Sequence, residues 1–181
     1  MRPRRLHANS CNPGFMEIGF RLGTEKLYNY IDAFGFGEKT GIDLLGESTG
    51  IVFNVDRVGP VELATSSFGQ GNSTTPIQLT SAMSACINGG NLLKPFILKS
   101  MQNEIGDTIY ETPVTIKRQV ISKETSDIMR YALETVSALG TGRGAYAEGY
   151  LVGGKTGTAQ KVGDDGHYMQ GNYILSFLGA A

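Results

Sequence analysis

The sequence is poor in the residues that build disulfide frameworks and metal sites. Its two cysteines, Cys11 and Cys86, lie far apart in the chain, so we expect two free thiols, with Cys86 buried in a helix. Its two histidines, His7 and His167, offer too few ligands for a zinc site. Neither histidine lies on a segment that predicts the scaffold of a serine–histidine–acid triad. We therefore expect no metal or other cofactor.

Long hydrophobic runs and an excess of charge are also absent. No stretch of about 18 consecutive apolar residues occurs, so no helix of this sequence is expected to span a membrane. No signal peptide is recognisable. The formal net charge is −1, which argues against a nucleic-acid-binding surface. The short basic cluster Arg2, Arg4 and Arg5 is expected to be a solvated terminus.

The residues that are present suit one globular domain. The chain has 181 residues, of which 40% are hydrophobic, and this is enough to bury a core. Glycine is frequent, with 25 residues, which predicts many tight turns or close backbone approaches. No internal repeat, low-complexity tract or second domain is apparent, so residues 1–181 are expected to belong to a single domain.

Hydrophobic spacing predicts four helices, over residues 13–22, 24–31, 76–87 and 122–139. Asn12 is expected to cap the first of them and Thr75 the third, since both side chains accept hydrogen bonds from free N–H groups at a helix start. The last helix is expected to bury an apolar side formed by Ile128, Met129, Ala132, Val136 and Leu139.

Loops and short strands are expected between and after these helices. Residues 35–50 and the small-residue, glycine-rich segment 61–74 are expected to be loops, and the second lacks the spacing of a phosphate-binding loop. Residues 96–98 and 108–110 are expected to pair as a hairpin, with its turn around Gly106 and Asp107. Residues 150–152 and 173–178 are expected to be antiparallel strands. This order of elements favours an α+β fold over alternating βαβ units.

The triplet Lys-Thr-Gly occurs twice. Lys155-Thr156-Gly157 follows the apolar run 150–152 and continues into Thr158, so a strand is expected to deliver a lysine and two hydroxyls to one place. Lys39-Thr40-Gly41 has no apolar strand before it. We therefore expect the copy at 155–157 to belong to an active site and the copy at 39–41 to be a turn with a solvated lysine.

Several motifs together resemble those of one enzyme family. Ser10-Cys11-Asn12 resembles the Ser-x-Asn motif of the penicillin-binding transpeptidases, and Lys155-Thr156-Gly157 resembles their Lys-Thr-Gly motif, in the family's order. Residues 34–43, 67–79 and 140–142 resemble segments of the class B enzymes. The resemblance covers nearly all of residues 8–181, and the sporulation-type class B proteins of Gram-positive bacteria are the most similar group.

The resemblance implies an activity, a fold and partners. It implies a peptidoglycan D,D-transpeptidase, in which a serine attacks the D-Ala-D-Ala amide of a stem peptide and a second stem resolves the acyl-enzyme into a cross-link. It implies part of the serine β-lactamase and penicillin-binding fold, with a helical region and part of an antiparallel sheet. Peptidoglycan stem peptides, β-lactams and cell-wall synthesis proteins are the implied partners. The implied location is the extracytoplasmic face of the cell membrane, and division, elongation and sporulation all stay open as roles.

By the same resemblance, each motif residue has an expected role. Ser10 relays a proton to the leaving group, Asn12 holds the substrate amide, and Lys155 places a positive charge beside both. Thr156 and Thr158 bind the substrate carboxylate, and the Thr158 N–H is an oxyanion-hole donor. Gly157 lets the substrate lie against the strand because it has no Cβ.

The sequence departs from the family in one respect. No serine in it is followed three residues later by lysine, although the family's nucleophile comes from a Ser-x-x-Lys motif upstream of Ser-x-Asn. We expect the nucleophile and its base to lie outside this chain or to have been lost, and the family's sheet to continue beyond residue 181. A partial domain of this kind is expected to form no acyl-enzyme by itself. Because a truncated sheet leaves unpaired edges and exposed apolar faces, the chain is expected to self-associate, swap elements or be partly disordered.

Three other interpretations stay open at this level. A serine β-lactamase fragment would share the motifs but hydrolyse the acyl-enzyme. A non-catalytic module that binds partners in the cell-wall machinery would also fit a chain without the nucleophile. A globular domain with coincidental motifs is the third. A Ser-x-x-Lys motif in the extended reading frame would favour the enzyme over the module.

Overall fold

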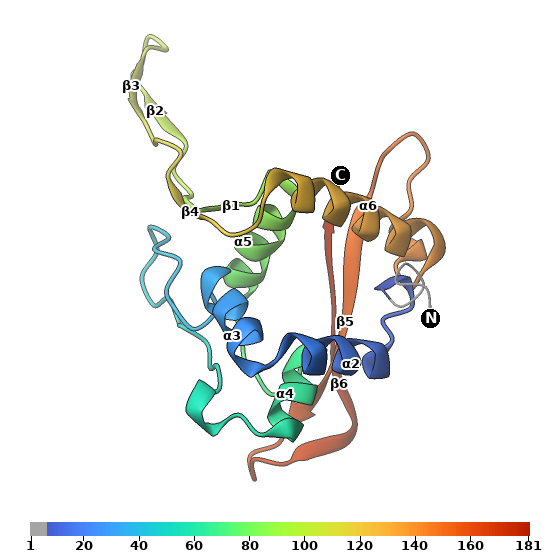
Figure 1. The fold of residues 1–181 in the computed structure, drawn as a ribbon. Helices are drawn as coiled ribbons and strands as arrows, with labels where there is room; N and C mark the ends of the chain where they lie inside the picture. Colours follow the sequence, from blue (N-terminus) through green and yellow to red (C-terminus); the bar gives the residue numbers. More distant parts are fainter. Residues whose placement is uncertain (1–6) are drawn as a thin grey trace. The chain divides into compact units, whose positions relative to one another are not determined.

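The computed structural model describes residues 7–181, so the basic cluster Arg2, Arg4 and Arg5 lies outside the described part of the chain. Helices and short antiparallel sheets make it an α+β protein, as predicted (Figure 1). Its elements are, in order, α2 (Asn12–Leu22), α3 (Thr24–Ala33), the 3-10 turn η1 (Val55–Arg57), α4 (Pro60–Ser67), α5 (Pro76–Ile87), β1 (Asn91–Leu93), β2 (Ser100–Gln102), β3 (Thr108–Glu111), β4 (Ile116–Gln119), α6 (Lys123–Leu139), η2 (Arg143–Ala145), β5 (Gly153–Val162) and β6 (Tyr168–Ala180).

The chain divides into two compact units, each made of segments that are far apart in sequence. Of the described residues, the first comprises 7–27, 53–72 and 127–181, and the second comprises 28–52 and 73–126. Sequence patterns do not reveal this division, because two of its boundaries fall inside the helices α3 and α6 rather than in a linker.

The first unit contains the long β5–β6 hairpin (Figure 1). The strands are antiparallel from the Gly153–Ala180 pair to the Val162–Tyr168 pair. The expected pairing of residues 173–178 with the Lys155 strand is thereby confirmed. The predicted strand at 150–152 is wrong. Gly149 has a φ of 85° and lies in a turn that the Tyr150 N–H closes on the Ala147 carbonyl at 3.2 Å, and Tyr150 and Leu151 are 70% and 76% exposed.

Helices α2 and α4 pack together in the first unit. A Cβ at Gly19 of α2 would overlap the hydroxyl of Ser67 of α4, so the two helices approach closely there. Helix α4 was predicted to be loop. It forms because Pro60 starts it and the Glu62 carboxylate accepts the Gly59 N–H at 2.9 Å. Its small, polar residues hide the helical period from a hydrophobicity pattern.

Two other helix features differ from the prediction in detail. The N-cap of α2 is Cys11, and Asn12 is the first helical residue. In α6 the buried positions include Leu133, Val136 and Ser137, whereas Ile128 and Leu139 are 62% and 67% exposed. The predicted apolar side of α6 is therefore only partly right, since a buried serine carries no hydrophobic signal.

The second unit is organised around α5. Thr75 caps this helix by accepting the Gln78 N–H at 3.2 Å, and the Gln78 side chain accepts the Thr75 N–H at 2.9 Å, so the predicted cap is confirmed. The Gln78 side chain is 1% exposed and donates to the carbonyl oxygens of Glu38 and Thr49 at 2.8 and 2.9 Å. One amide thus attaches the loop 34–50, which contains the expected loop 35–50, to α5.

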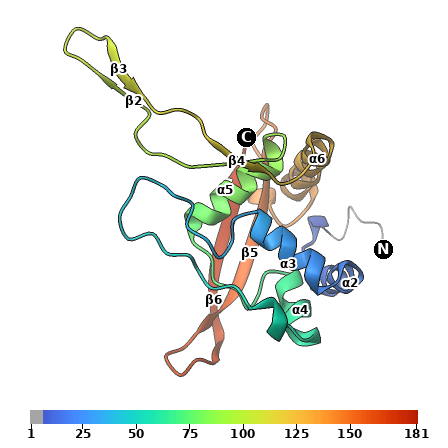
Figure 2. The same cartoon turned by 60° about the vertical axis from the view of Figure 1, so that its left-hand side comes forward.

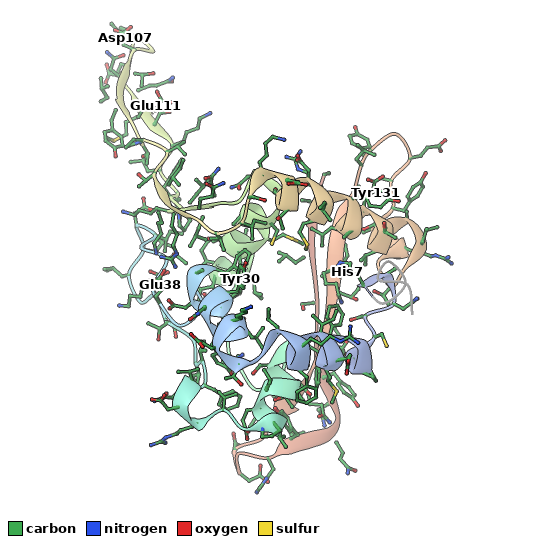
Figure 3. The ribbon with its side chains drawn as sticks, in the orientation of Figure 1. His7, Tyr30, Glu38, Asp107, Glu111 and Tyr131 are labelled. Atoms are coloured by element: carbon green, nitrogen blue, oxygen red, sulfur yellow. The ribbon has the colours of Figure 1, made fainter. Side chains whose placement is uncertain are left out.

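Glu38 makes the charged contacts of the same loop (labelled in Figure 3). Its carboxylate accepts from Arg118 at 2.7 Å and from Lys117 at 3.1 Å, and both cations lie on β4. Burial alone would raise the pKa of the Glu38 carboxyl, but the hydrogen bonds from Arg118 and Lys117 outweigh it and hold that pKa below its ordinary value.

The strands of the second unit form two small antiparallel pairs. Strand β1 pairs with β4, and β2 pairs with β3 in a hairpin that extends away from α5 (Figure 2). The predicted turn at Gly106 is correct, but β2 lies at Ser100–Gln102 rather than at 96–98. The Ile97 N–H donates to the Asp43 carboxylate at 3.0 Å instead of joining a ladder.

Candidate active site

Ser10 lies in a strained turn at the start of the first unit. Its φ is 50°, the only positive φ of a non-glycine residue in the described chain, and such values are uncommon and cluster at functional positions. The Ser10 N–H donates to the His7 carbonyl at 3.1 Å. The Ala8 carbonyl accepts the Thr141 N–H at 3.1 Å, so the turn is attached to the end of α6.

Lys155 connects the two predicted motifs. Its ammonium on β5 donates to the Ser10 hydroxyl at 2.7 Å and to the Thr156 carbonyl at 2.9 Å. Burial lowers the pKa of Lys155 below its ordinary value. The structure thereby brings together a hydroxyl and an ammonium that are 145 residues apart in the sequence.

The other residues of the Lys-Thr-Gly segment have different neighbours. Successive side chains of a strand point to opposite faces, and the Thr156 hydroxyl lies 2.8 Å from the Thr141 hydroxyl. Thr158 is exposed. A Cβ at Gly157 would lie 2.5 Å from the Ser176 hydroxyl of β6, which adds a reason for glycine that the sequence did not reveal.

Asn12 is not joined to this arrangement by a described hydrogen bond. It is the first residue of α2 and is exposed. Within residues 7–181, β5 pairs only with β6, so its other edge offers backbone groups to a ligand. Gln70, from the glycine-rich segment, lies 3.5 Å from the Gln160 side chain on β5.

His7 is a neighbour of the site that sequence reasoning did not identify (labelled in Figure 3). Its ring lies edge-on to Phe15, with the centroids 6.2 Å apart. Its Nε2 is buried and has no hydrogen-bond partner among the described residues. Burial, and then the positive charge of Lys155, lower the pKa of His7. No motif signals this residue, because its surroundings come from distant segments.

The second Lys-Thr-Gly copy has a structural role, as predicted. Lys39 is exposed and Thr40 is buried. The Thr40 N–H donates to the Glu47 carboxylate at 2.7 Å, and the Thr40 hydroxyl donates to the same oxygen. Desolvation of Glu47 opposes ionisation, but these hydrogen bonds lower its pKa overall. Thr40 and Glu47 therefore close a loop rather than present a site.

A family model described as the penicillin binding protein transpeptidase domain matches residues 1–181. The chain belongs to this transpeptidase family. It is 60% identical over 174 residues to stage V sporulation protein D of Bacillus subtilis, covering 96% of this chain and 27% of that protein. It is 33% identical to a peptidoglycan D,D-transpeptidase FtsI homolog of Mesostigma viride, covering 94% of this chain and 31% of that protein.

Solved structures agree with the family's fold. Penicillin-binding protein 3 of Mycobacterium tuberculosis, crystallised with aztreonam, is 32% identical to this chain, with a TM-score of 0.89. The match covers 99% of this chain and 42% of the solved one. The D,D-transpeptidase domain of a peptidoglycan glycosyltransferase from Eggerthella lenta has a TM-score of 0.82 at 25% identity, and the match covers 99% of this chain and 45% of the solved one. The penicillin-binding fold and the sporulation-type resemblance expected from the sequence are confirmed. This chain spans about a quarter to a third of the length of the curated relatives.

Proposed function

We propose that the protein containing this chain is a peptidoglycan D,D-transpeptidase and that the chain supplies its proton-relay and carboxylate-binding groups. The observation that carries the proposal is the 2.7 Å hydrogen bond from the Lys155 ammonium to the Ser10 hydroxyl. It joins the Ser-x-Asn turn to the Lys-Thr-Gly strand, and relatives of the chain are named peptidoglycan D,D-transpeptidases.

The proposed acylation step begins with a serine from a Ser-x-x-Lys segment elsewhere in the full-length protein. Its oxygen attacks the carbonyl carbon between the two D-alanines of a stem peptide, and the C–N bond breaks. The departing nitrogen takes a proton from the Ser10 hydroxyl, which in turn receives one from the nucleophile's side. Lys155 stabilises the electron-rich Ser10 oxygen during this transfer, because it donates to that oxygen and carries a positive charge.

The proposed binding step uses the exposed side of β5. The terminal carboxylate of the substrate accepts hydrogen bonds from the Thr156 and Thr158 hydroxyls, and the Lys155 charge attracts it. The Thr158 N–H donates to the oxygen of the tetrahedral intermediate. Asn12 holds the substrate amide, and Gly157 allows the peptide to approach the strand. An amine of a second stem peptide then attacks the acyl-enzyme and releases the serine.

Location and partners are part of the same proposal. We place the protein at the extracytoplasmic face of the cell membrane, among cell-wall synthesis proteins, because its relatives include penicillin-binding proteins. None of the helices in residues 7–181 has the length and apolar composition needed to cross a membrane. The 60% identity with stage V sporulation protein D favours a role in sporulation.

Labelling with a fluorescent penicillin tests the proposal. The full-length protein should acquire a covalent, saturable label, whereas the 181-residue chain alone should acquire none, since it has no Ser-x-x-Lys motif. Lys155→Ala in the full-length protein should slow labelling by at least about 100-fold, the usual loss when acid–base catalysis fails. Lys39→Ala is the matched control and should label at the wild-type rate, because Lys39 belongs to the structural copy of the motif.

Three results would contradict the proposal. Saturable labelling of the isolated chain would show that it holds its own nucleophile. An unlabelled full-length protein would favour the non-catalytic, partner-binding alternative. Rapid loss of the label by hydrolysis would favour the β-lactamase alternative.

A further inference from the structure

Thr141 contacts both halves of the candidate site, yet the proposed mechanism gives it no task. It lies in the turn Gly140-Thr141-Gly142 that follows α6. Its N–H donates to the Ala8 carbonyl in the Ser10 turn at 3.1 Å. Its hydroxyl lies 2.8 Å from the Thr156 hydroxyl on β5. One residue thus connects the Ser-x-Asn turn with the Lys-Thr-Gly strand.

The turn around Thr141 is closely packed, so the position of its backbone is fixed by the fold. Gly140 and Gly142 both donate their N–H groups to the Val136 carbonyl, at 3.0 and 3.1 Å. A Cβ at Gly140 would overlap the Ala8 carbonyl oxygen, and a Cβ at Gly142 would lie 3.3 Å from the Phe177 ring. The backbone on both sides of Thr141 therefore has little freedom, while its side chain stays exposed.

The number of protons on the two hydroxyls limits what Thr156 can do. Each hydroxyl has one proton to donate, and a carboxylate only accepts. If Thr156 donates to Thr141, it has no proton left for a ligand carboxylate. If Thr141 donates to Thr156, the Thr156 proton is free to point at the ligand. Because hydrogen bonds to a carboxylate are stronger than those between neutral groups, a bound carboxylate selects the second arrangement.

We propose that Thr141 is a positioning residue for carboxylate recognition: it donates to the Thr156 hydroxyl and thereby directs the Thr156 proton to the terminal carboxylate of the bound ligand. This inference rests on the proposed function. It assigns to the Gly-Thr-Gly turn a specificity for anionic over neutral ligand ends. Without the Thr141 hydroxyl, Thr156 loses both its donor and its fixed orientation.

Acylation kinetics of the full-length protein with benzylpenicillin and with its methyl ester test the inference. The two ligands differ in the charge of the group that Thr156 is proposed to bind. Thr141→Val should raise the dissociation constant of benzylpenicillin by about tenfold, because Thr156 then no longer directs its proton to the carboxylate and its charge-assisted hydrogen bond is lost. It should leave the acylation rate at saturation and the dissociation constant of the ester within about twofold of wild type.

Two further variants separate the hydroxyl from the backbone contact and from packing. Thr141→Ser restores a hydroxyl and should restore the affinity for benzylpenicillin. Thr135→Val is the matched control, because the Thr135 hydroxyl bonds only to the Tyr131 carbonyl of its own helix at 2.8 Å. In a Thr156→Val background, Thr141→Val should have no further effect, since the two hydroxyls act as one unit. The valine variants keep the Thr141 N–H that binds Ala8.

If Thr141→Val raised the dissociation constants of benzylpenicillin and of its methyl ester equally, Thr141 would have a packing role and the inference would be overturned. Unchanged affinity for benzylpenicillin would also overturn it. Additive losses in the double variant would do the same. If Thr141→Val does not fold, as judged by its melting temperature, Thr141→Ala and Thr141→Ser give the same comparison. If wild-type protein is not acylated by either ligand, the proposed function falls and takes this inference with it, a result distinct from a failure of the Thr141 variants alone.

Discussion

At the scale of single residues, the buried imidazole of His7 makes stability depend on pH. Burial and Lys155 lower the pKa of His7 in the folded state, so the unfolded chain binds the proton more readily. Stability is then complete above the ordinary histidine pKa of about 6.5 and falls as the pH drops below it. Each unit of pKa difference corresponds to at most about 1.4 kcal/mol, which solvent screening at this half-buried position reduces.

Urea unfolding of the 181-residue chain at pH 7 and pH 5 measures this effect. His7→Phe keeps a ring against Phe15 and should abolish the part of the acid destabilisation that His7 causes. The other histidine provides the control, because His167 is exposed in the turn between β5 and β6, and His167→Phe should keep the wild-type difference between the two pH values. A wild-type difference that survives in His7→Phe would show that other groups cause it.

The site residues differ in how far sequence predicts them. Ser10 and Lys155 were found as motif members, and the structure places them in contact. The contact of Thr156 with Thr141, and the position of His7 beside the site, were not found. A motif reports residues that are neighbours in the chain. Partners that come from another segment become visible only when the fold has brought the segments together.

At the scale of secondary-structure elements, Gln78 connects α5 with the loop 34–50. Its buried amide donates to the Glu38 and Thr49 carbonyls and accepts the Thr75 N–H. Gln78→Ala would leave these groups without partners, and an unsatisfied buried polar group costs about 1–3 kcal/mol. We expect a loss of about 2–4 kcal/mol in the free energy of unfolding.

Chemical denaturation followed by circular dichroism tests this expectation. Gln102→Ala, on the exposed strand β2, makes the same chemical change and should cost no more than about 0.5 kcal/mol. If Gln78→Ala and Gln102→Ala lowered the free energy of unfolding equally, the Gln78 hydrogen bonds would contribute little to stability. A second consequence of the same contacts is that Gln78→Ala should increase amide exchange in the loop 34–50, because the loop loses its attachment to α5.

Elements with strong local signals were predicted well, and those stabilised by distant partners were not. The cap at Thr75 and the end of the first predicted helix at residue 22 depend on adjacent residues, and the structure has both. Strand β4 was missed because it pairs with β1, more than twenty residues earlier. The run 150–152 was misassigned because its apolar residues suggest a strand, while the turn that contains Gly149 precedes an extended segment in which Tyr150 and Leu151 are exposed.

At the scale of the whole molecule, the division into two units was the feature least accessible from sequence. Each unit combines segments separated by tens of residues, and the hydrophobic period of a helix such as α6 says nothing about which unit each part of it joins. The family match covers both units together. The α+β class was predictable because it depends only on the order of the helices and strands.

At the same scale, β6 leaves apolar side chains exposed beside an open strand edge in the 181-residue chain. Tyr173, Ile174 and Leu175 are 53%, 59% and 74% exposed, and β6 pairs only with β5 in the described residues. An open strand edge flanked by exposed apolar side chains is a template for pairing with another chain. The isolated chain should therefore self-associate at micromolar concentrations, and light scattering should report species larger than a monomer.

Leu175→Lys should reduce this self-association, because a lysine beside an open strand edge has to lose water when a second strand pairs there. Ile128→Lys is the matched control: Ile128 is 62% exposed but lies on α6, where a helix has no unpaired backbone edge. It adds the same charge and should leave the distribution of sizes unchanged. A monodisperse wild-type monomer would contradict the expectation, and equal effects of the two lysines would mean that net charge, rather than the β6 edge, controls association.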